Sequence, residues 1–208
     1  MNDIKCVKLC TEMEIIMSTT QPIRDAKELE AFRNFYKDRE SNPRNYALIV
    51  LGINCALRIS DLLELQWNTV YNFKKKCFRK HMTVCERKTG KMTIIALNDN
   101  AILALNAYRQ SLKSIQPGQY IFYGRDMRSS LSRSQAFRII KHAATVLGIG
   151  DDISCHSLRK TFGYYAWKNG TPPAMLMDIY NHSSYEITKR YLGIKQDDKD
   201  SVFLGLNL

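Results

Sequence analysis

The chain has 208 residues, of which 45% are hydrophobic and 25% are charged, and its formal net charge is +11. This composition excludes a disordered chain, and the length predicts one domain, or one domain with an appendage, around a sizeable core. The excess positive charge indicates a polyanionic partner, most simply nucleic acid, and no apolar stretch is long enough for a transmembrane helix or a secretory signal.

The first part of the chain predicts a leader followed by three helices. Residues 1–22 look like a flexible leader rather than part of a domain. Apolar residues recur at helical spacing over 25–37, and residues 46–57 are apolar nearly all round, which predicts a buried helix. Ser60 can cap a short third helix over 61–66.

The middle of the chain changes to a β-rich character. Three stretches, 69–71, 82–84 and 92–95, predict one small three-stranded antiparallel sheet. The densest basic stretch, 74–91, runs through this region and contains a single acid, Glu86. Such a run is most often a solvated face, so by itself it favours DNA binding only weakly.

The rest of the chain predicts five helices with clear start signals, and then a tail. Asn98, Ser132 and Ser184 are candidate N-caps, and Ser132 can form a capping box with Gln135. The tail, 195–208, is first polar and then apolar, so we expect it to cover its own core or a neighbouring protomer. The helices fall at 99–114, after Ser132, at 157–169, after Thr171 and at 185–192.

The six cysteines and four histidines are numerous enough to consider a disulfide framework or a metal site. The cysteines contain no paired CxxC motif, however, and the histidines do not complete a zinc pattern with them. We therefore expect free thiols in a reducing, cytoplasmic environment, and neither a metal nor another cofactor.

Several residues carry groups suited to chemistry, and each has a structural interpretation when taken singly. A lone histidine, such as His156 or His182, is usually a structural hydrogen bonder. Arg159 fits a surface charge early in a helix, and Tyr191 fits the core of an amphipathic one. Arg58, directly after the buried helix, has two interpretations: a cation on the C-terminal helix dipole, or a semi-buried guanidinium that binds an anion bidentately.

Three motifs resemble the conserved boxes of the tyrosine recombinase (phage integrase) family, in the family's order. They are Ala56-Leu-Arg-Ile-Ser-Asp-Leu-Leu-Glu-Leu-Gln-Trp67, His156-Ser-Leu-Arg-Lys-Thr-Phe162 and Asn181-His-Ser-Ser-Tyr-Glu-Ile-Thr-Lys-Arg-Tyr191. A fourth motif, the turn Arg87-Lys-Thr-Gly-Lys91, lies where the family carries its β-hairpin lysine. Four motifs in order and spacing are far more specific than any one of them.

The resemblance implies the fold class and the division of the chain. The class is α+β, mostly helical, with a tyrosine recombinase catalytic domain over 23–194 that includes the small three-stranded sheet, followed by the tail. Fewer than sixty residues precede Arg58, whereas family members usually carry a second DNA-clamping domain there. The chain therefore resembles the short forms that consist of the catalytic domain alone.

The resemblance also implies how a DNA phosphate would be held. Arg58 and Arg159 would clamp the scissile phosphate and neutralise its non-bridging oxygens. His156 would act in proton transfer, and His182 would donate a hydrogen bond to the same phosphate. The family usually has glycine before this second histidine, and Asn181 replaces it here; asparagine tolerates a left-handed backbone better than most residues.

The remaining roles belong to a nucleophile and an acid. Tyr191 would attack the phosphate and form a 3′-phosphotyrosyl linkage, and Lys88 would protonate the leaving 5′-oxygen. Lys91 is close enough in sequence to compete with Lys88 for that role. A protein–DNA ester preserves the phosphodiester energy, so the resemblance implies strand exchange without metal or ATP.

The function implied is site-specific recombination of double-stranded DNA by integration, excision or inversion, in a protein encoded by a bacterium, a phage or another mobile element. Two alternatives remain open: a non-catalytic DNA-binding protein on the same fold, and a topoisomerase IB-like relaxing enzyme. By the same resemblance we expect a tetramer on DNA and a monomer without it. We expect the basic cluster, on one hairpin beside the site, to contact DNA. One basic residue at the start of a later helix should contact DNA as well. The residues expected to bind DNA are Lys74, Lys75, Lys76, Arg79, Lys80, Arg87, Lys91 and Arg133.

Overall fold

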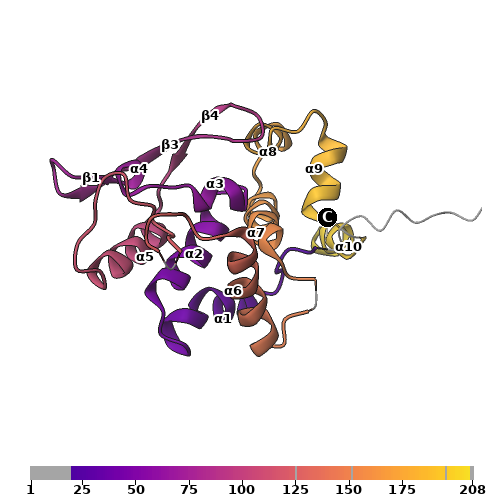
Figure 1. Ribbon diagram of the computed structural model, residues 1–208. Helices are drawn as coiled ribbons and strands as arrows, with labels where there is room; N and C mark the ends of the chain where they lie inside the picture. Colours follow the sequence, from indigo (N-terminus) through magenta and orange to yellow (C-terminus); the bar gives the residue numbers. More distant parts are fainter. Residues whose placement is uncertain (1–19, 125, 151, 195, 207–208) are drawn as a thin grey trace, which may run out of the picture.

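The computed structural model describes residues 20–124, 126–150, 152–194 and 196–206 (Figure 1). The described chain is mostly helical with short antiparallel strands, which confirms the expected class. Nearly all of the expected leader, residues 1–19, lies outside the described part. None of the described helices is both long and apolar enough to cross a membrane.

A buried helix, α2 (Pro43–Asn54), forms the centre of the fold, as its apolar sequence predicts. Residues Ala47–Leu51 of this helix have no exposed surface. It packs against α1 (Ala26–Asp38), α5 (Asp99–Gln110) and α7 (Cys155–Lys168), while α6 (Arg133–Val146) packs between α1 and α7. This helical body is the platform on which the later elements are held.

The helix starts follow the capping chemistry in three of four predicted cases. Asn98 caps α5, Ser132 forms the predicted capping box of α6, and Ser184 caps α9 (Tyr185–Leu192). The prediction for Ser60 is wrong. The third helix, α3 (Ile59–Leu63), begins two residues earlier, with Arg58 at its N-cap and no side-chain cap.

The single three-stranded sheet predicted from the sequence is also wrong, because the strands form two separate hairpins. Strand β1 (Tyr71–Asn72), which follows the short helix α4 (Trp67–Val70), pairs with β2 (Cys77–Phe78). Strand β3 (His81–Cys85) pairs with β4 (Met92–Ala96). A turn stabilised by the Asn72 side chain, which accepts from Lys75 N at 3.0 Å, closes the first hairpin locally. Closing a short loop costs less entropy than pairing β1 with a strand farther along the chain.

A second small core holds the C-terminal helices on α7. It is built from Leu176 and Tyr180 of α8 (Pro173–Tyr180) and Leu192 of α9, all fully buried. The backbone of Gly163 on α7 faces Tyr180 and Leu192 so closely that a Cβ atom there would collide with both side chains. The missing side chain is what lets α8 and α9 approach α7.

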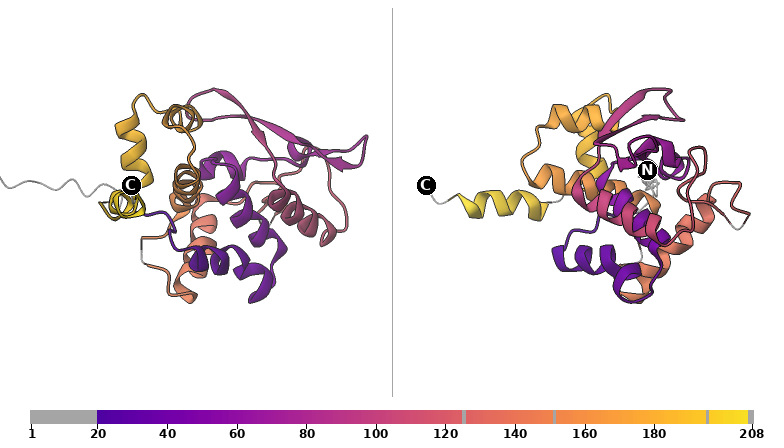
Figure 2. Two further views of the ribbon diagram at one scale, coloured as in Figure 1. Left: turned by 180° about the vertical axis from the view of Figure 1, so that it is seen from behind. Right: turned by 90° about the vertical axis from the view of Figure 1, so that its left-hand side faces the viewer.

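The last helix, α10 (Gln196–Gly205), extends away from the body (Figure 2, right). Its N-terminal part is tied down, because the Tyr164 hydroxyl donates to Asp198 at 3.0 Å and Arg24 pairs with the same carboxylate at 3.8 Å. Arg24 also donates to Gly193 O, the left-handed end of α9. The segment before α1 thus holds α9 and α10 against the body.

The close contact at Gly163 predicts the cost of a single methyl group. Gly163→Ala should lower the free energy of unfolding by about 1–3 kcal/mol, because overpacking forces buried side chains apart. Gly118→Ala is the matched control, since a Cβ there meets nothing within 4 Å. Urea unfolding of both variants measures the difference, and equal stabilities would show that α7 and α8 are not tightly packed.

Candidate active site

The structure brings Arg58, Arg159, His182 and Tyr191 together where the α2–α3 junction, α7, α8 and α9 meet. The rings of His182 and Tyr191 lie 5.3 Å apart between centroids, edge to face. Arg58 and Arg159 are both close enough to Tyr191 to lower the pKa of its phenol, which burial raises more strongly. Residues that are over 130 positions apart in the sequence thus face one site.

Arg159 is the buried cation of the site, with 5% of its surface exposed. Its guanidinium donates to Ala56 O and, at 3.5 Å, to Tyr180 O. The same group lies over the Tyr180 ring, 4.8 Å from the centroid, and the Tyr180 hydroxyl donates back to Arg159 O at 2.8 Å. These contacts hold the guanidinium in one orientation and compensate for its burial.

Arg58 does not end a helix, so the helix-dipole interpretation from the sequence is wrong. Between α2 and Arg58 the chain turns through Ala56, whose φ of 53° lies in the left-handed region. This turn directs the Ala56 carbonyl to Arg159 and puts Arg58 at the start of α3, where it pairs with Glu86. Its side chain keeps 22% of its surface exposed, so an anion can still reach it.

His182 follows a left-handed residue, as the sequence predicts. Asn181 ends α8 with φ 54° and ψ 48°, and so carries out the turn that glycine would make. The Nδ1 atom of His182 then lies 3.0 Å from the Thr188 hydroxyl, which leaves Nε2 available to another partner. The ring also stacks on Tyr180, 5.5 Å between centroids.

His156 lies in the first turn of α7, next to a surface hollow that Arg133 also lines. Desolvation and the positive charges of Lys160, Arg133, Arg159 and Arg58 lower the pKa of this imidazole. Desolvation and the two arginines lower the pKa of His182 as well. Both imidazoles are therefore neutral at pH 7 in the free protein.

The turn of the β3–β4 hairpin carries Lys88 toward α8 (Figure 1). Lys88 makes no hydrogen bond or ion pair with any described residue. Lys91, the competing candidate, pairs with Asp178 of α8 at 2.8 Å. The structure thus distinguishes Lys88, to which the resemblance assigns the acid role, from its competitor Lys91, which is engaged in an ion pair.

The other basic residues are divided between two hairpins rather than gathered on one. Lys74, Lys75 and Lys76 lie on the β1–β2 turn, at the opposite end of the strand region from the Lys88 turn (Figures 1 and 2). Arg79 and Lys80 connect the hairpins and are exposed, as are Arg87, which pairs with Glu64 at 3.5 Å, and Arg133 at the start of α6.

The sequence missed the residues that support this site. Ala56 and Tyr180 hold Arg159, and Glu86 holds Arg58, but none of them was identified as functional from the sequence. Glu86 did carry a signal, as the lone acid in the basic stretch. Ala56 and Tyr180 carried none, because their contacts with Arg159 join distant parts of the chain.

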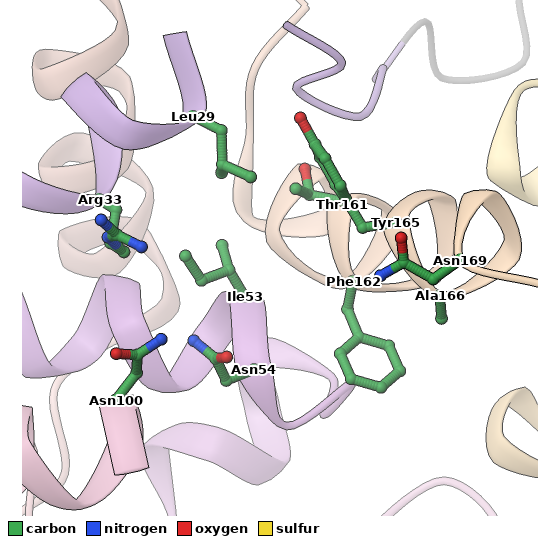
Figure 3. A pocket seen from close by; sticks show the side chains of 10 residues that line it. All are labelled: Leu29, Arg33, Ile53, Asn54, Asn100, Thr161, Phe162, Tyr165, Ala166 and Asn169. Carbon is green, nitrogen blue, oxygen red and sulfur yellow. The ribbon is translucent and has the colours of Figure 1, made fainter. Parts of the chain in front are cut away.

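A cavity elsewhere in the fold lies apart from the candidate catalytic residues. A cavity of about 280 Å³ lies between α1, α2, α5 and α7, lined by side chains such as Leu29, Ile53 and Phe162 (Figure 3). It contains none of the six candidate catalytic residues. Among the described residues, no three His, Cys, Asp or Glu side chains are grouped so that they could hold a metal ion.

Two guanidinium groups and the imidazole of His182 around one phenol suit a tetrahedral oxyanion. Planar guanidinium groups bind phosphate oxygens bidentately and supply positive charge without a metal. A phenol beside them is placed to attack the phosphorus atom of a bound phosphodiester.

Comparisons with known proteins agree with this chemistry. The model of the phage integrase family matches residues 24–197. The probable integrase/recombinase YoeC of Bacillus subtilis is 36% identical over 187 residues, which cover 90% of this chain and 97% of that protein. The type 1 fimbriae regulatory protein FimE of Escherichia coli K12 is 27% identical over 168 residues, covering 79% and 82%.

Solved structures share the fold. The XerA recombinase structure superposes with a TM-score of 0.71 at 20% identity, over 91% of this chain and 67% of that chain. The XerH site-specific recombinase in complex with its palindromic difH substrate superposes with a TM-score of 0.68 at 15% identity, over 86% and 52%. With a family match over most of its length and the YoeC relationship, the chain belongs to the phage integrase family, the tyrosine-type site-specific DNA recombinases.

Proposed function

We propose that this chain cuts and rejoins DNA at a defined site through a 3′-phosphotyrosyl linkage formed by Tyr191. The observation that supports this most strongly is the position of the phenol, which lies within the field of both Arg58 and Arg159 and beside His182. The substrate is double-stranded DNA in the cytoplasm. Related recombinases have been solved with DNA, among them XerH and a Tn1549 transposon integrase.

Arg58 and Arg159 bind the scissile phosphate in this proposal. Charge builds up on the non-bridging oxygens as the phosphorus becomes five-coordinate, and fixed guanidinium groups in a partly dry site stabilise that charge. His182 donates to the same oxygens. Because the product is a phosphodiester of tyrosine, the bond energy is retained and religation requires no nucleotide.

Tyr191 must lose its proton to attack. Burial raises the pKa of the phenol, so it stays protonated at neutral pH until a base acts, while the two arginines favour the phenolate that forms. His156 is neutral and can accept the proton. The acid in this proposal is Lys88, which makes no hydrogen bond or ion pair with any described residue and can therefore protonate the leaving 5′-oxygen.

The basic side chains of both hairpins bind the DNA backbone on either side of the cleaved phosphate. Lys74, Lys75 and Lys76 follow β1 on the turn of the other hairpin, and we propose that they contact other phosphates of the same duplex. Arg133, which lines a surface hollow with His156, contributes a further contact from the start of α6. Such contacts give affinity and register rather than sequence specificity.

We also propose that several copies assemble on DNA through α10. The C-terminal half of this helix exposes large apolar side chains that water solvates poorly. Val202, Phe203 and Leu204 keep 55%, 76% and 79% of their surface exposed, and Leu206, directly after the helix, keeps 60%. A second protomer bound to a neighbouring site on the DNA can cover them.

The covalent step has a direct test. A duplex that carries a nick close to the cleavage site traps the adduct, because the short fragment diffuses away. We expect a wild-type protein–DNA adduct that denaturing electrophoresis resolves, and its loss to background in Tyr191→Phe. Tyr185→Phe, on the same helix, is the matched control and should retain the adduct.

The outcome also separates the alternatives. Absence of any adduct with wild-type protein on its genuine site would indicate a non-catalytic DNA-binding protein. Relaxation of a supercoiled plasmid that lacks the site would instead indicate a topoisomerase-like enzyme.

The pH dependence tests the role of His156. Cleavage at limiting protein concentration reports groups of the free enzyme, so a base of lowered pKa keeps the rate level as the pH falls through about 6.5. The rate should decline only in more acidic buffer. Lys160→Gln removes a cation that lowers this pKa, which makes protonation easier and moves the decline to higher pH.

Lys27→Gln, on the exposed face of α1, controls for the loss of any one charge. If both variants show the same acid limb as the wild type, a group other than His156 accepts the proton.

Removal of residues 200–208 tests assembly. The truncated chain keeps Asp198 and its contacts with Tyr164 and Arg24, so we expect a thermal stability close to that of the wild type. Native gels should show weaker higher-order complexes on DNA, while cleavage of a single site persists. The double variant Phe203→Ser, Leu204→Ser should behave alike. A truncated chain that unfolds would show that the tail packs on its own domain.

A further inference from the structure

Glu86 is an acid placed where a phosphate-binding site should have none. It is the lone acidic residue in the basic stretch 74–91, and it lies just after β3 with 3% of its surface exposed. A carboxylate facing Arg58 opposes the binding of an anion by that arginine, so its presence needs a reason other than attraction for DNA.

The carboxylate joins two parts of the site. Its Oε2 atom accepts from Arg58 Nη1 and, at 3.2 Å, from the Thr89 hydroxyl. Its Oε1 atom accepts from the Thr93 hydroxyl at 3.1 Å. Thr89 is the direct neighbour of Lys88 in the turn, so one side chain contacts both the phosphate-binding arginine and the turn that carries the acid.

The main chain of Glu86 closes the same turn. Its N–H donates to Lys91 O at 2.9 Å, and its carbonyl accepts from Gly90 N at 2.7 Å. The next amide, Arg87 N, donates to the Asp61 carboxylate of α3 at 3.1 Å. The turn is therefore fixed to the helix that follows Arg58 by backbone contacts and by the Glu86 side chain.

The carboxylate is ionised across the working pH range. Burial alone would raise the pKa of Glu86, but the hydrogen bonds from Arg58, Thr93 and Thr89 and the charge of Arg58 outweigh it and lower the pKa. A buried, ionised and fully hydrogen-bonded carboxylate is rigid, which suits it to set the positions of its partners.

We propose that Glu86 is a positioning residue that couples Arg58 to the Lys88 turn, so that the phosphate clamp and the acid for the leaving oxygen are placed together. The proposal rests on the function proposed above for Arg58 and Lys88. Because Glu86 opposes phosphate binding electrostatically, its loss should leave DNA affinity unchanged or stronger while the cleavage rate falls. A residue with a general structural role would lower both.

The test uses Glu86→Ala and Glu86→Gln with two suicide duplexes. One is the ordinary phosphodiester. The other carries sulfur in place of the bridging 5′-oxygen at the cleaved position, and a thiolate leaves without receiving a proton. Lys88→Ala is the reference variant for comparing the two duplexes. It lacks only the acid, so its cleavage rate should recover on the sulfur substrate.

We expect Glu86→Ala to cleave the ordinary duplex roughly tenfold to a hundredfold more slowly, the range for a catalytic group that is misplaced by about 1 Å. On the sulfur substrate the cleavage rate of Glu86→Ala should recover much of the way to the wild-type rate. The part of the defect that persists there measures the misplacement of Arg58. Glu86→Gln, which keeps the shape and the contacts with Thr89 and Thr93, should lose less. Glu64→Gln is the matched control, since Glu64 pairs with the same turn through exposed Arg87, and it should cleave like the wild type.

Two results would overturn the proposal: wild-type rates in both Glu86 variants, or a defect of equal size on the two substrates. If Glu86→Ala fails to fold by circular dichroism, the same comparison is made with Glu86→Gln alone. Wild-type protein that forms no adduct on either duplex refutes the proposed function itself, and so that failure is distinguishable from a failure at Glu86.

Discussion

The site depends on a guanidinium group that the fold has to bury. Arg159 can remain charged inside the protein only where carbonyl oxygens and a π face replace its water. Ala56 and Tyr180 supply them, from the end of α2 and the end of α8. Satisfying this one cation therefore determines how the central helix ends and where α8 lies, and these in turn set the positions of Arg58 and His182.

The hairpin and the nucleophile helix are attached to this centre in different ways. The Lys88 turn is held by ionic and main-chain contacts through Glu86 and Asp61. Helix α9 is held by the small apolar core that includes Leu192, by the close approach at Gly163, and by Arg24 at its C-terminal end. The Lys88 turn is thus held mainly by polar contacts, which include the ion pair of Lys91 with Asp178 of α8, whereas α9 is held mainly by apolar packing.

Sequence reasoning succeeded where the signal is local. The caps at Asn98, Ser132 and Ser184 and the left-handed Asn181 follow from the chemistry of single residues and their neighbours. Sequence reasoning failed where the local sequence is compatible with two different structures. Ser60 is a good cap that α3 does not use, and β1 pairs with the nearby β2 rather than joining a larger sheet, because closing the short Asn72 turn costs less entropy.

By itself the sequence determined the family, the helical class and the identity of the candidate catalytic residues, because each of these is carried by residue types at a fixed spacing. Only the tertiary structure decided which lysine is free, which acid faces Arg58 and how the basic stretch divides between two hairpins. Those outcomes depend on contacts between α3, the β3–β4 turn and α8. Burial and ion pairing between distant segments have no periodic pattern along the chain that could reveal them.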